Sequence, residues 1–368
     1  TRDDLSDLIW EVQAELGTSH AYETPPASWT QEVRRLGHLG ADLDRSEDGL
    51  WRITRVLPGE SSTVAGRSPL RAPGAAVQIG EALVGVDGHS VDSVIGPWPL
   101  LVGTAGKPVE LRLRSTVDSG DAGSGDERTI VVVPVANEMP LRYHDWVAGR
   151  RAAVHAATEG RVGYLHVPDM MALGWAQLHR DLHTEVAREA VVLDVRGNGG
   201  GHTSQLVVEK LARELTGWTI PRGMLPHPYP MDVRRGPLVT LTDENAGSDG
   251  DIVTAMIQER GLGPVVGMRS WGGVVGIETG IRLVDGTEVT QPRYAMWVVN
   301  RGWSVENYGV NPDVEVPMQP QAWAQDLDPQ LDTAVELALT ALAQAPAATA
   351  PTTEDRPSTV PPPLPPRP

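Results

Sequence analysis

The stretch Ala190-Val191-Val192-Leu193-Asp194-Val195-Arg196-Gly197-Asn198-Gly199-Gly200-Gly201 decides the fold of the second half of this chain. Its first seven residues form a mostly apolar run, which is typical of a buried strand in a parallel sheet. The glycines that follow let the backbone turn sharply and approach a ligand closely. Neither the GxGxxG nor the Walker phosphate-binding pattern is completed, so a phosphate cradle is not favoured. We therefore predict a buried strand that ends in a turn able to offer backbone N–H groups.

Strands and helices alternate on both sides of this stretch. Further strands are predicted at 162–167 and 238–242. Apolar residues at helical spacing predict helices over 175–188, 204–215 and 251–260. Strands that alternate with helices favour an α/β layer with right-handed crossovers. We assign residues 138–345 to this α/β domain.

Residues 37–137 have a different pattern, with short strands interrupted by Gly, Pro and Asp. Residues 50–56 alternate like a half-buried strand. The segment Gly80 to Gly88 ends in an Asp-Gly pair, which favours a tight hairpin turn. Strands at 109–114 and 128–133 flank a Gly/Ser/Asp loop at 117–126, which predicts a long exposed hairpin connection.

The two ends of the chain are distinct again. Residues 1–36 form an N-terminal helical piece, with one helix over 4–16 that stops at Gly17 and a second over 28–36. Residues 346–368 are rich in Pro, Ala and Thr and predict a disordered or extended tail.

Composition narrows the function. Acidic residues outnumber basic residues by 48 to 31, for a formal charge of −17, so nucleic acid is a poor main partner. The 368 residues include no cysteine, which excludes disulfides, thiolate metal sites and a cysteine nucleophile. No apolar run is long enough to span a membrane, and the start lacks the pattern of a secretory signal, although it is not a Met. We expect a cytoplasmic protein without metal or cofactor.

The segment Thr242-Asp243-Glu244-Asn245-Ala246-Gly247-Ser248-Asp249-Gly250-Asp251 contains the strongest candidate nucleophile. A strand ends, small residues turn, and a helix begins at once. Ser248 would then lie at a strand-to-helix elbow beside the N–H groups of a helix N-terminus, the geometry that acyl transfer requires. Ser and Asp also serve routinely as helix N-caps, so a purely structural role stays open from this segment alone.

Ten histidines compete for the role of general base. His20 lies in Thr18-Ser19-His20 after the first helix, and His202 follows the glycine turn, so His202 is the stronger candidate from its position alone. His179 and His183 have helical spacing but lack the glutamate of an HExxH zinc site, and we interpret them as a solvated helix face. Glu306, in Trp303-Ser304-Val305-Glu306-Asn307-Tyr308-Gly309-Val310-Asn311-Pro312-Asp313, would by itself be an ordinary acidic loop residue.

Two resemblances connect these segments. The run from Gly80 to Gly88 resembles that of a PDZ domain. In such a domain Gly37-His38-Leu39-Gly40 would be the loop that binds a peptide carboxylate, and Leu39 and Gly40 would be its binding residues. A spacer without a ligand is the alternative for that region. Four features occur together in this chain: the PDZ-like region, the Ser-His pair, the SDGD elbow and the ENxGVxPD stretch. In this combination the chain resembles the tricorn proteases, relatives of the C-terminal processing peptidases, over almost all of residues 4–340.

The tricorn resemblance implies both a fold and a mechanism. The fold would be a crotonase-like α/β catalytic domain with an inserted PDZ-like domain. The mechanism would be that of a serine endopeptidase: Ser248 as nucleophile, His20 as base in preference to His202, Ser19 and Glu306 orienting the base, and the N–H groups of Asp249 and Gly201 as oxyanion hole. The Ser/Lys dyad of the processing peptidases is excluded because no lysine follows Lys210.

The resemblance also implies context. Tricorn proteases carry β-propellers ahead of the catalytic part, so we expect this chain to be a C-terminal piece that acts on peptides as a homo-oligomer, a hexamer in the family. The family's acidic residue for basic P1 side chains would fall near Thr219, where no carboxylate stands; Asp232 is the nearest downstream. A non-catalytic PDZ scaffold and a crotonase-like acyl-thioester enzyme remain alternatives, and the combined Ser19, His20, Ser248 and Glu306 set disfavours the scaffold.

Overall fold

The computed structural model of the chain describes residues 1–26, 35–60, 64–115, 126–352, 354 and 366. It divides into two compact units, Thr1–Trp29 with Arg151–Pro368, and Thr30–Arg150. Most of the helix predicted over 28–36, most of the loop at 117–126 and most of the tail after 352 lie outside the described residues.

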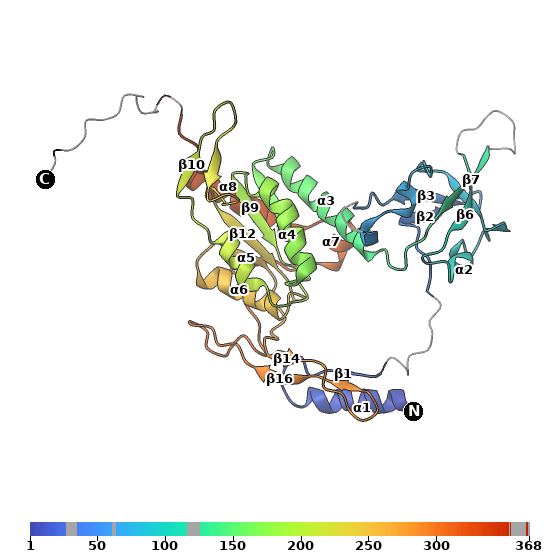
Figure 1. Cartoon of the computed structure of the whole chain (residues 1–368), viewed down its shortest axis with the longest axis horizontal. Coiled ribbons are helices and arrows are strands. Elements are labelled where there is room, and N and C mark those ends of the chain that lie inside the picture. Colours follow the sequence, from blue (N-terminus) through green and yellow to red (C-terminus); the bar gives the residue numbers. More distant parts are fainter. Residues whose placement is uncertain (27–34, 61–63, 116–125, 353, 355–365, 367–368) are drawn as a thin grey trace. The chain divides into compact units, whose positions relative to one another are not determined.

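A parallel sheet forms the centre of the larger unit (Figure 1). Its strand order is β17-β13-β12-β9-β8, and every neighbouring pair is parallel. The strands are β8 (Val162–His166), β9 (Ala190–Asp194), β12 (Leu238–Thr242), β13 (Val265–Gly267) and β17 (Val314–Glu315). Since parallel strands need crossovers, helices connect them: α4 (Ala172–Glu185), α5 (Ser204–Leu211) and α6 (Asp249–Glu259). The predicted α/β layer is confirmed.

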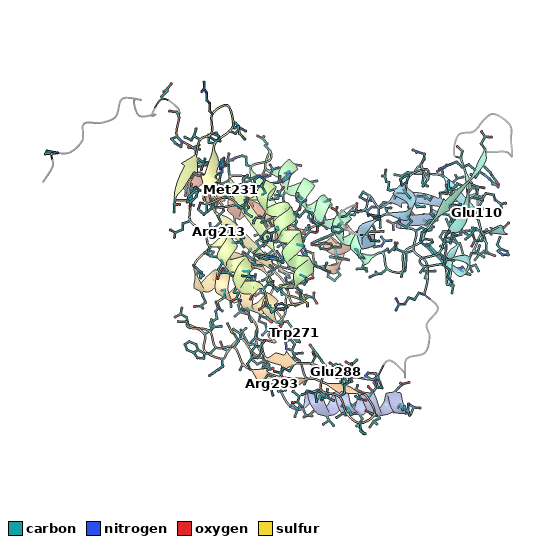
Figure 2. The ribbon with its side chains drawn as sticks, viewed as in Figure 1. Glu110, Arg213, Met231, Trp271, Glu288 and Arg293 are labelled. Carbon is teal, nitrogen blue, oxygen red and sulfur yellow. The ribbon has the colours of Figure 1, made fainter. Side chains whose placement is uncertain are left out.

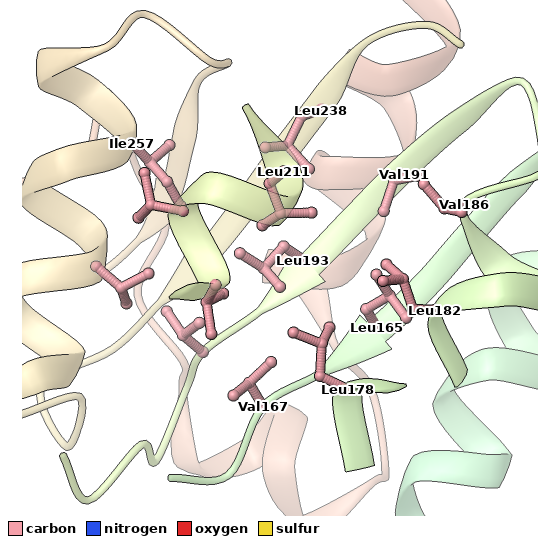
Figure 3. Close-up of a cluster of buried hydrophobic side chains, with 14 of the residues drawn as sticks. Leu165, Val167, Leu178, Leu182, Val186, Val191, Leu193, Leu211, Leu238 and Ile257 are labelled. Carbon is pink, nitrogen blue, oxygen red and sulfur yellow. The ribbon is translucent and has the colours of Figure 1, made fainter. Parts of the chain in front are cut away.

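Successive residues of β9 point to opposite faces of this sheet, as the strand period requires. Val191, Leu193 and then Val195 pack with Leu178, Leu182, Leu211 and Ile257 of α4, α5 and α6 in one buried cluster (Figure 3). The long helix α8 (Pro329–Gln344) packs on β8, β9, β12 and β13 through a face that buries Leu331, Ala334, Ala338 and Leu342. Both faces of the sheet are covered, which explains why the strands read as continuous apolar runs.

The larger unit also brings its N-terminal segment beside a distant part of the chain. Helix α1 (Arg2–Ala14) begins with a capping box between Thr1 and Asp4. After it, β1 (Glu23–Thr24) pairs with β15 (Glu288–Val289), and β14 (Gly276–Glu278) pairs with β16 (Gln291–Tyr294). Residues 17–24 are thereby held against the segment that follows β13. A further hairpin joins β10 (Gly217–Thr219) to β11 (His227–Tyr229).

The smaller unit is built on an antiparallel sheet of order β2-β3-β4-β6-β7, with β5 paired to β4. Its elements are β2 (Ala41–Arg45), β3 (Trp51–Val56), β4 (Ala82–Val86), β5 (His89–Ser90), β6 (Val109–Arg114), β7 (Glu127–Val132), the 3-10 turns Val64–Gly66 and Pro69–Arg71, and the short helix α2 (Trp98–Leu101). Asp87 and Gly88 both have positive φ, 47° and 75°, so the predicted tight turn between β4 and β5 is confirmed.

Several sequence expectations were wrong in detail. The helix predicted from Trp175 begins at Ala172, because the Asp169 carboxylate accepts hydrogen bonds from the N–H groups of Met171 and Gly174. The helix predicted to run to 215 ends at Leu211, and the chain then enters β10 with Thr216 bonded to the carbonyl of Tyr229.

Other elements were not foreseen or do not form. The apolar residues Met296 to Val299, which precede the Glu306 segment, form no regular strand, since Val298 and Gly302 close a tight turn. Helices α3 (Met139–Ala157), α7 (Pro320–Ala324) and α8 were not predicted. In the described part of the chain, no helix is both long enough and apolar enough to cross a membrane.

Candidate active site

Ser248 lies where β12 has ended and α6 begins, at the N-cap position of that helix. Its backbone is strained, with φ 57° and ψ −118°, a region that side-chain-bearing residues rarely occupy. Its side chain makes no capping hydrogen bond, so the alternative of a simple N-cap is wrong for this serine. The N–H groups of the first turn of α6 have no intrahelical acceptors, and Asp249 provides the first of them.

The glycine turn packs directly against Ser248. A Cβ added to Gly200 would lie 2.5 Å from the Cβ and 3.1 Å from the Oγ of Ser248, so only glycine fits there. Gly201 has φ 148°. On either side of it, the Gly200 carbonyl accepts from the Met170 N–H, and the His202 N–H donates to the Met170 carbonyl. Among the hydrogen bonds of the described residues, none uses the N–H of Gly201. Two backbone N–H groups, those of Gly201 and Asp249, are thus available in segments adjoining the serine.

Asn198, which the sequence analysis did not single out, organises this contact. Its amide donates to the carbonyl of Val167, and its side-chain oxygen accepts from the N–H of Gly200. Its backbone carbonyl accepts from the N–H of Gly247, immediately before Ser248. The residue is fully buried. One side chain and one peptide group therefore fix the glycine turn and the serine elbow to each other.

The two aspartates after Ser248 also bond outside their own helix. Asp249 accepts from the backbone N–H and the hydroxyl of Ser204, at 3.0 and 2.7 Å, which ties α6 to the start of α5. Asp251 is fully buried and accepts from the hydroxyl of Ser270 and from the N–H groups of Gly272 and Gly273. Burial raises the pKa of the Asp251 carboxyl, and these hydrogen bonds oppose the rise.

Ser19, His20 and Glu306 form a continuous hydrogen-bonded chain. The Ser19 hydroxyl lies 2.8 Å from His20 Nδ1 and 3.1 Å from Glu306 Oε2. The N–H of Ser19 donates to Glu306 Oε1 at 2.7 Å, and the N–H groups of Val274 and Val275 donate to Oε2 at 2.7 and 3.0 Å. Four donors converge on one carboxylate, which holds it in place.

The donor pattern determines the proton arrangement on His20. A carboxylate only accepts, so the single hydroxyl proton of Ser19 goes to Glu306. The short contact between Ser19 Oγ and His20 Nδ1 then requires the proton to be on Nδ1. In the neutral imidazole this leaves Nε2 as the basic nitrogen.

The surroundings of His20 favour its neutral form. Burial lowers its pKa below the usual 6.5, while the charges of Glu306 and Asp251 act to raise it. The backbone of His20 has φ 60°, and Asn307, next to Glu306, also has φ 60°. Strained backbone thus occurs at His20 and beside Glu306 as well as at Ser248, and such strain clusters at functional sites.

Trp271 lies between His20 and the serine elbow. Its ring centroid is 5.3 Å from that of His20 in an edge-on arrangement. Its backbone N–H donates to the carbonyl of Ala246, and its indole packs on Gly247. Among the described residues, no hydrogen bond joins His20 to Ser248. Catalytic contacts are often long in ligand-free structures and shorten when substrate binds.

The other histidines of the sequence analysis also lie in the larger unit. His202 is exposed beside the glycine turn. His179 bonds to the carbonyl of Trp175, and His183 is 75% exposed and pairs with Asp232. Asp232 is therefore already engaged, and Thr219 lies in β10. The described residues contain no cluster of three or more His, Asp or Glu side chains suited to a metal ion.

Leu39 and Gly40 lie in the smaller unit, directly before the edge strand β2. The Leu39 side chain is buried in the core of that unit. A pocket of about 310 Å³ adjoins it, lined by His38, Asp42, Trp98, Glu138 and Arg142 among others. Gly40 has φ 70°, and a Cβ there would lie 2.9 Å from Leu141 Cδ1, which explains its glycine.

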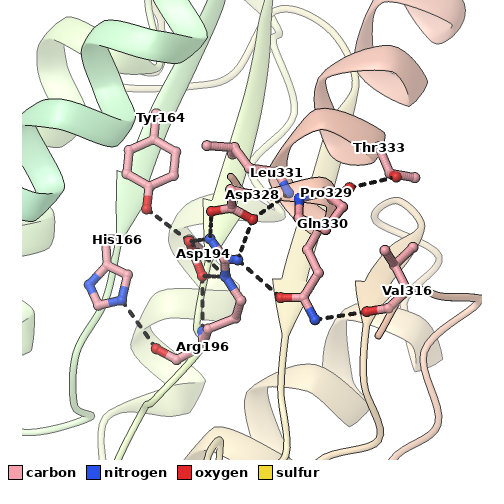
Figure 4. Close-up of polar contacts among 10 residues, drawn as sticks. All are labelled: Tyr164, His166, Asp194, Arg196, Val316, Asp328, Pro329, Gln330, Leu331 and Thr333. Atoms are coloured by element: carbon pink, nitrogen blue, oxygen red, sulfur yellow. Dashed lines mark hydrogen bonds and ion pairs between the residues drawn. The ribbon is translucent and has the colours of Figure 1, made fainter. Parts of the chain in front are cut away.

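A buried polar cluster anchors the strand that leads into the glycine turn (Figure 4). The Arg196 guanidinium bonds to Asp194 and to Asp328, and its backbone carbonyl lies 3.2 Å from His166 Nε2. Asp194 also accepts from the Tyr164 hydroxyl at 2.8 Å. Burial of the charges is compensated by this mutual pairing, and α8 is attached to β9 through Asp328.

Comparisons with known proteins show the family of this chain. Residues 161–316 match the profile of peptidase family S41, and residues 37–137 match that of the tricorn protease PDZ domain. The chain is 62% identical over 351 residues to tricorn protease homolog 1 of Streptomyces coelicolor, covering 95% of the chain and 32% of that relative. It is 39% identical over 340 residues to a putative tricorn-like protease C-terminal subunit of Sulfurisphaera tokodaii, covering 92% of the chain and 38% of that relative.

A solved structure gives the same result for the fold. The crystal structure of the tricorn protease superposes with a TM-score of 0.86 at 35% identity, covering 93% of this chain and 33% of that chain. The chain spans about a third of the length of the relatives it matches. With a peptidase family S41 domain and a tricorn PDZ domain in one chain, and close relatives of that name, this protein belongs to the tricorn protease family.

Proposed function

We propose that this protein is a serine endopeptidase that hydrolyses peptides through an acyl-enzyme on Ser248. The observation that carries the proposal is the hydrogen-bonded chain His20–Ser19–Glu306, which leaves Nε2 of His20 as a base. In the same site, Ser248 has a strained backbone and a side chain that makes no capping hydrogen bond. Its relatives are described as proteases, which supports the same chemistry.

The proposed reaction begins with proton transfer. His20 Nε2 takes the proton of the Ser248 hydroxyl as its oxygen attacks the scissile carbonyl carbon. Ser19 and Glu306 keep the imidazole oriented and stabilise its protonated form. The carbonyl oxygen, now negative, accepts hydrogen bonds from the N–H groups of Asp249 and Gly201.

The second half of the reaction returns the enzyme to its starting state. The tetrahedral intermediate collapses, the C–N bond breaks, and the leaving amine takes the proton from His20. Water then gives a proton to His20 and attacks the acyl carbon, and the second collapse releases the carboxylic acid while Ser248 regains its proton. No redox partner or metal is needed for this balance.

The proposal extends to the context of the whole protein. The α/β unit would have the crotonase-like arrangement of the S41 peptidases, and the smaller unit would bind peptide ends through the loop at Leu39 and Gly40. The chain would be a C-terminal piece of a longer cytoplasmic assembly, a hexamer as the family resemblance implies. The domain limits 1–36, 37–137, 138–345 and 346–368 belong to the same proposal.

A fluorophosphonate probe tests the central chemistry, because it phosphonylates only activated serines. We expect one adduct, at Ser248, located by peptide mass spectrometry. His20→Gln should slow labelling by about 10²-fold or more, the contribution expected of a general base. Ser304→Ala is the matched control, since Ser304 is an exposed serine bonded to the Arg301 carbonyl. A folded wild-type protein that stays unlabelled, or labelling that persists in Ser248→Ala, would overturn the proposal.

A further inference from the structure

Trp271, in the loop after β13, contacts both His20 and the elbow that carries Ser248. In Figure 2 it lies on the segment between the α/β layer and β14. It is 47% exposed, a high value for a tryptophan that touches two functional segments. Neither the mechanism above nor the sequence pattern gives it a role.

The backbone of this loop is held to the nucleophile's own helix. Asp251, in the first turn of α6, accepts from the Ser270 hydroxyl and from the N–H groups of Gly272 and Gly273, on both sides of Trp271. The N–H of Trp271 itself donates to the carbonyl of Ala246 at 3.0 Å. The position of the indole is therefore fixed relative to Ser248.

Two glycines, Gly247 and Gly273, leave the space that the indole of Trp271 occupies. A Cβ added to Gly247 would lie 2.7 Å from Trp271 Cε3, and one added to Gly273 would lie 2.2 Å from Cζ3. Separations this short do not occur between real side chains, so only glycine at both positions leaves room for the indole where it lies. The indole is consequently packed on the residue directly before Ser248.

The indole also contacts the ring of His20. The imidazole meets it edge-on, at 5.3 Å between centroids and 74° between planes, which is a favourable arrangement for two aromatic rings. The ring centroid of Tyr22, on the segment that carries His20, lies 5.8 Å from that of His20. The backbone around His20 is held by Glu306 through Ser19 and by the Thr290 hydroxyl, which donates to the His20 carbonyl. The indole is a further contact on the imidazole ring itself.

We propose that Trp271 is a positioning residue that holds the imidazole of His20 against the serine elbow and keeps solvent away from it. The inference rests on the proposed peptidase function, since it assigns His20 the role of base. An imidazole tied only through Ser19 at Nδ1 remains free to swing about that bond. A wall on one side of the ring restricts the swing, and misplacement by about 1 Å is enough to cost about 10²-fold in rate.

Solvent exclusion adds a second, measurable effect. Burial is the main cause of the lowered pKa of His20, and it acts against the carboxylates of Glu306 and Asp251. Tyr22 faces the same ring as a neutral phenol. Removing the indole admits water while both carboxylates stay in place, so the pKa of His20 should rise.

The test compares Trp271→Ala and Trp271→Phe with wild type by two readouts. The first is the rate of Ser248 phosphonylation as a function of pH. We expect the plateau rate to fall about 10-fold to 10²-fold in Trp271→Ala and less in Trp271→Phe, with the acidic limb displaced upward. Trp323→Ala, which removes an exposed tryptophan on α7, is the matched control and should change neither value.

The second readout does not depend on activity. Nuclear magnetic resonance titration of the histidine rings, with His20→Gln for assignment, should show the pKa of His20 rising in Trp271→Ala. If wild type fails to label but this shift occurs, the proposed function is wrong and the positioning contact is still supported. If the pKa of His20 is the same in wild type and in folded Trp271→Phe and Trp271→Ala, the inference on Trp271 is overturned.

Discussion

Ser19 and Glu306, which are 287 positions apart in the sequence, are joined by two hydrogen bonds, one from the Ser19 N–H and one from its hydroxyl. The same Ser19 hydroxyl also bonds to Nδ1 of His20. The imidazole is therefore linked, through Ser19, to a carboxylate that lies far along the chain. The N–H groups of Val274 and Val275 bring the carboxylate to its full complement of donors. In the proposed mechanism, Glu306 would therefore act on His20 through Ser19.

Replacing Glu306 by Gln should impair the reaction strongly. The amide nitrogen would face backbone N–H groups that need an acceptor, and the Ser19 hydroxyl would lose the charge that sets its direction. We expect kcat to fall by about 10² to 10⁴-fold, with a smaller change in KM. Peptide hydrolysis assays measure this, and Glu278→Gln, at an exposed glutamate paired with Arg293, is the control. A loss below about threefold would contradict the role of Glu306.

The pH dependence of the reaction follows from the direction of the His20 shift. The base must be neutral, and burial lowers the pKa of His20, so the neutral form persists to lower pH than for a free imidazole. We expect the acidic limb of kcat/KM to have its midpoint below 6.5. A midpoint at or above 6.5 would mean that the carboxylates of Glu306 and Asp251 outweigh burial, contrary to the structure.

Gly200 and Gly199 form a matched pair for testing the turn beside Ser248. Gly200→Ala would place a Cβ 2.5 Å from the Cβ of Ser248 at a backbone φ of 82°, so either the turn or the serine must move. Gly199 has nothing within 4 Å of its missing Cβ. We expect Gly200→Ala to lose about 10²-fold or more in labelling rate and Gly199→Ala to stay within about threefold of wild type. Equal rates for the two variants would show that the close contact has no consequence.

The sequence indicated much of this site because its local patterns are strong. The elbow before Ser248 and the glycines after Arg196 follow buried strands, and parallel strands place their carboxyl ends at one edge of the sheet. By contrast, Asn198, Asp251 and Trp271 act through contacts between segments far apart in the chain. Nothing in their immediate sequence distinguishes them from ordinary turn or helix residues.

The same reason explains the choice between His20 and His202. Position along the chain favours His202, which directly follows the glycine turn. In the structure His20 bonds to Ser19, which in turn bonds to Glu306, whereas His202 is exposed. The N-terminal segment is held by residues far along the chain, as in the pairing of β1 with β15, and no periodicity in the sequence predicts such contacts. The roles of His20 and Ser248 stay predictions until the labelling experiment is done.

The buried cluster around Arg196 makes a prediction about stability. Arg196→Ala would leave Asp194 and Asp328 buried without their common cation, and removing one partner of such a group costs about 3–5 kcal/mol in the free energy of unfolding. Arg161→Ala is the matched control, because its pair with Glu189 is exposed, at 47% and 42%, and contributes about 0–1 kcal/mol. Urea denaturation followed by circular dichroism measures both. Since Arg196 directly precedes the glycine turn, a folded Arg196→Ala protein should also label more slowly at Ser248. Equal unfolding free energies for the two variants would show that the cluster's mutual pairing does not stabilise the fold.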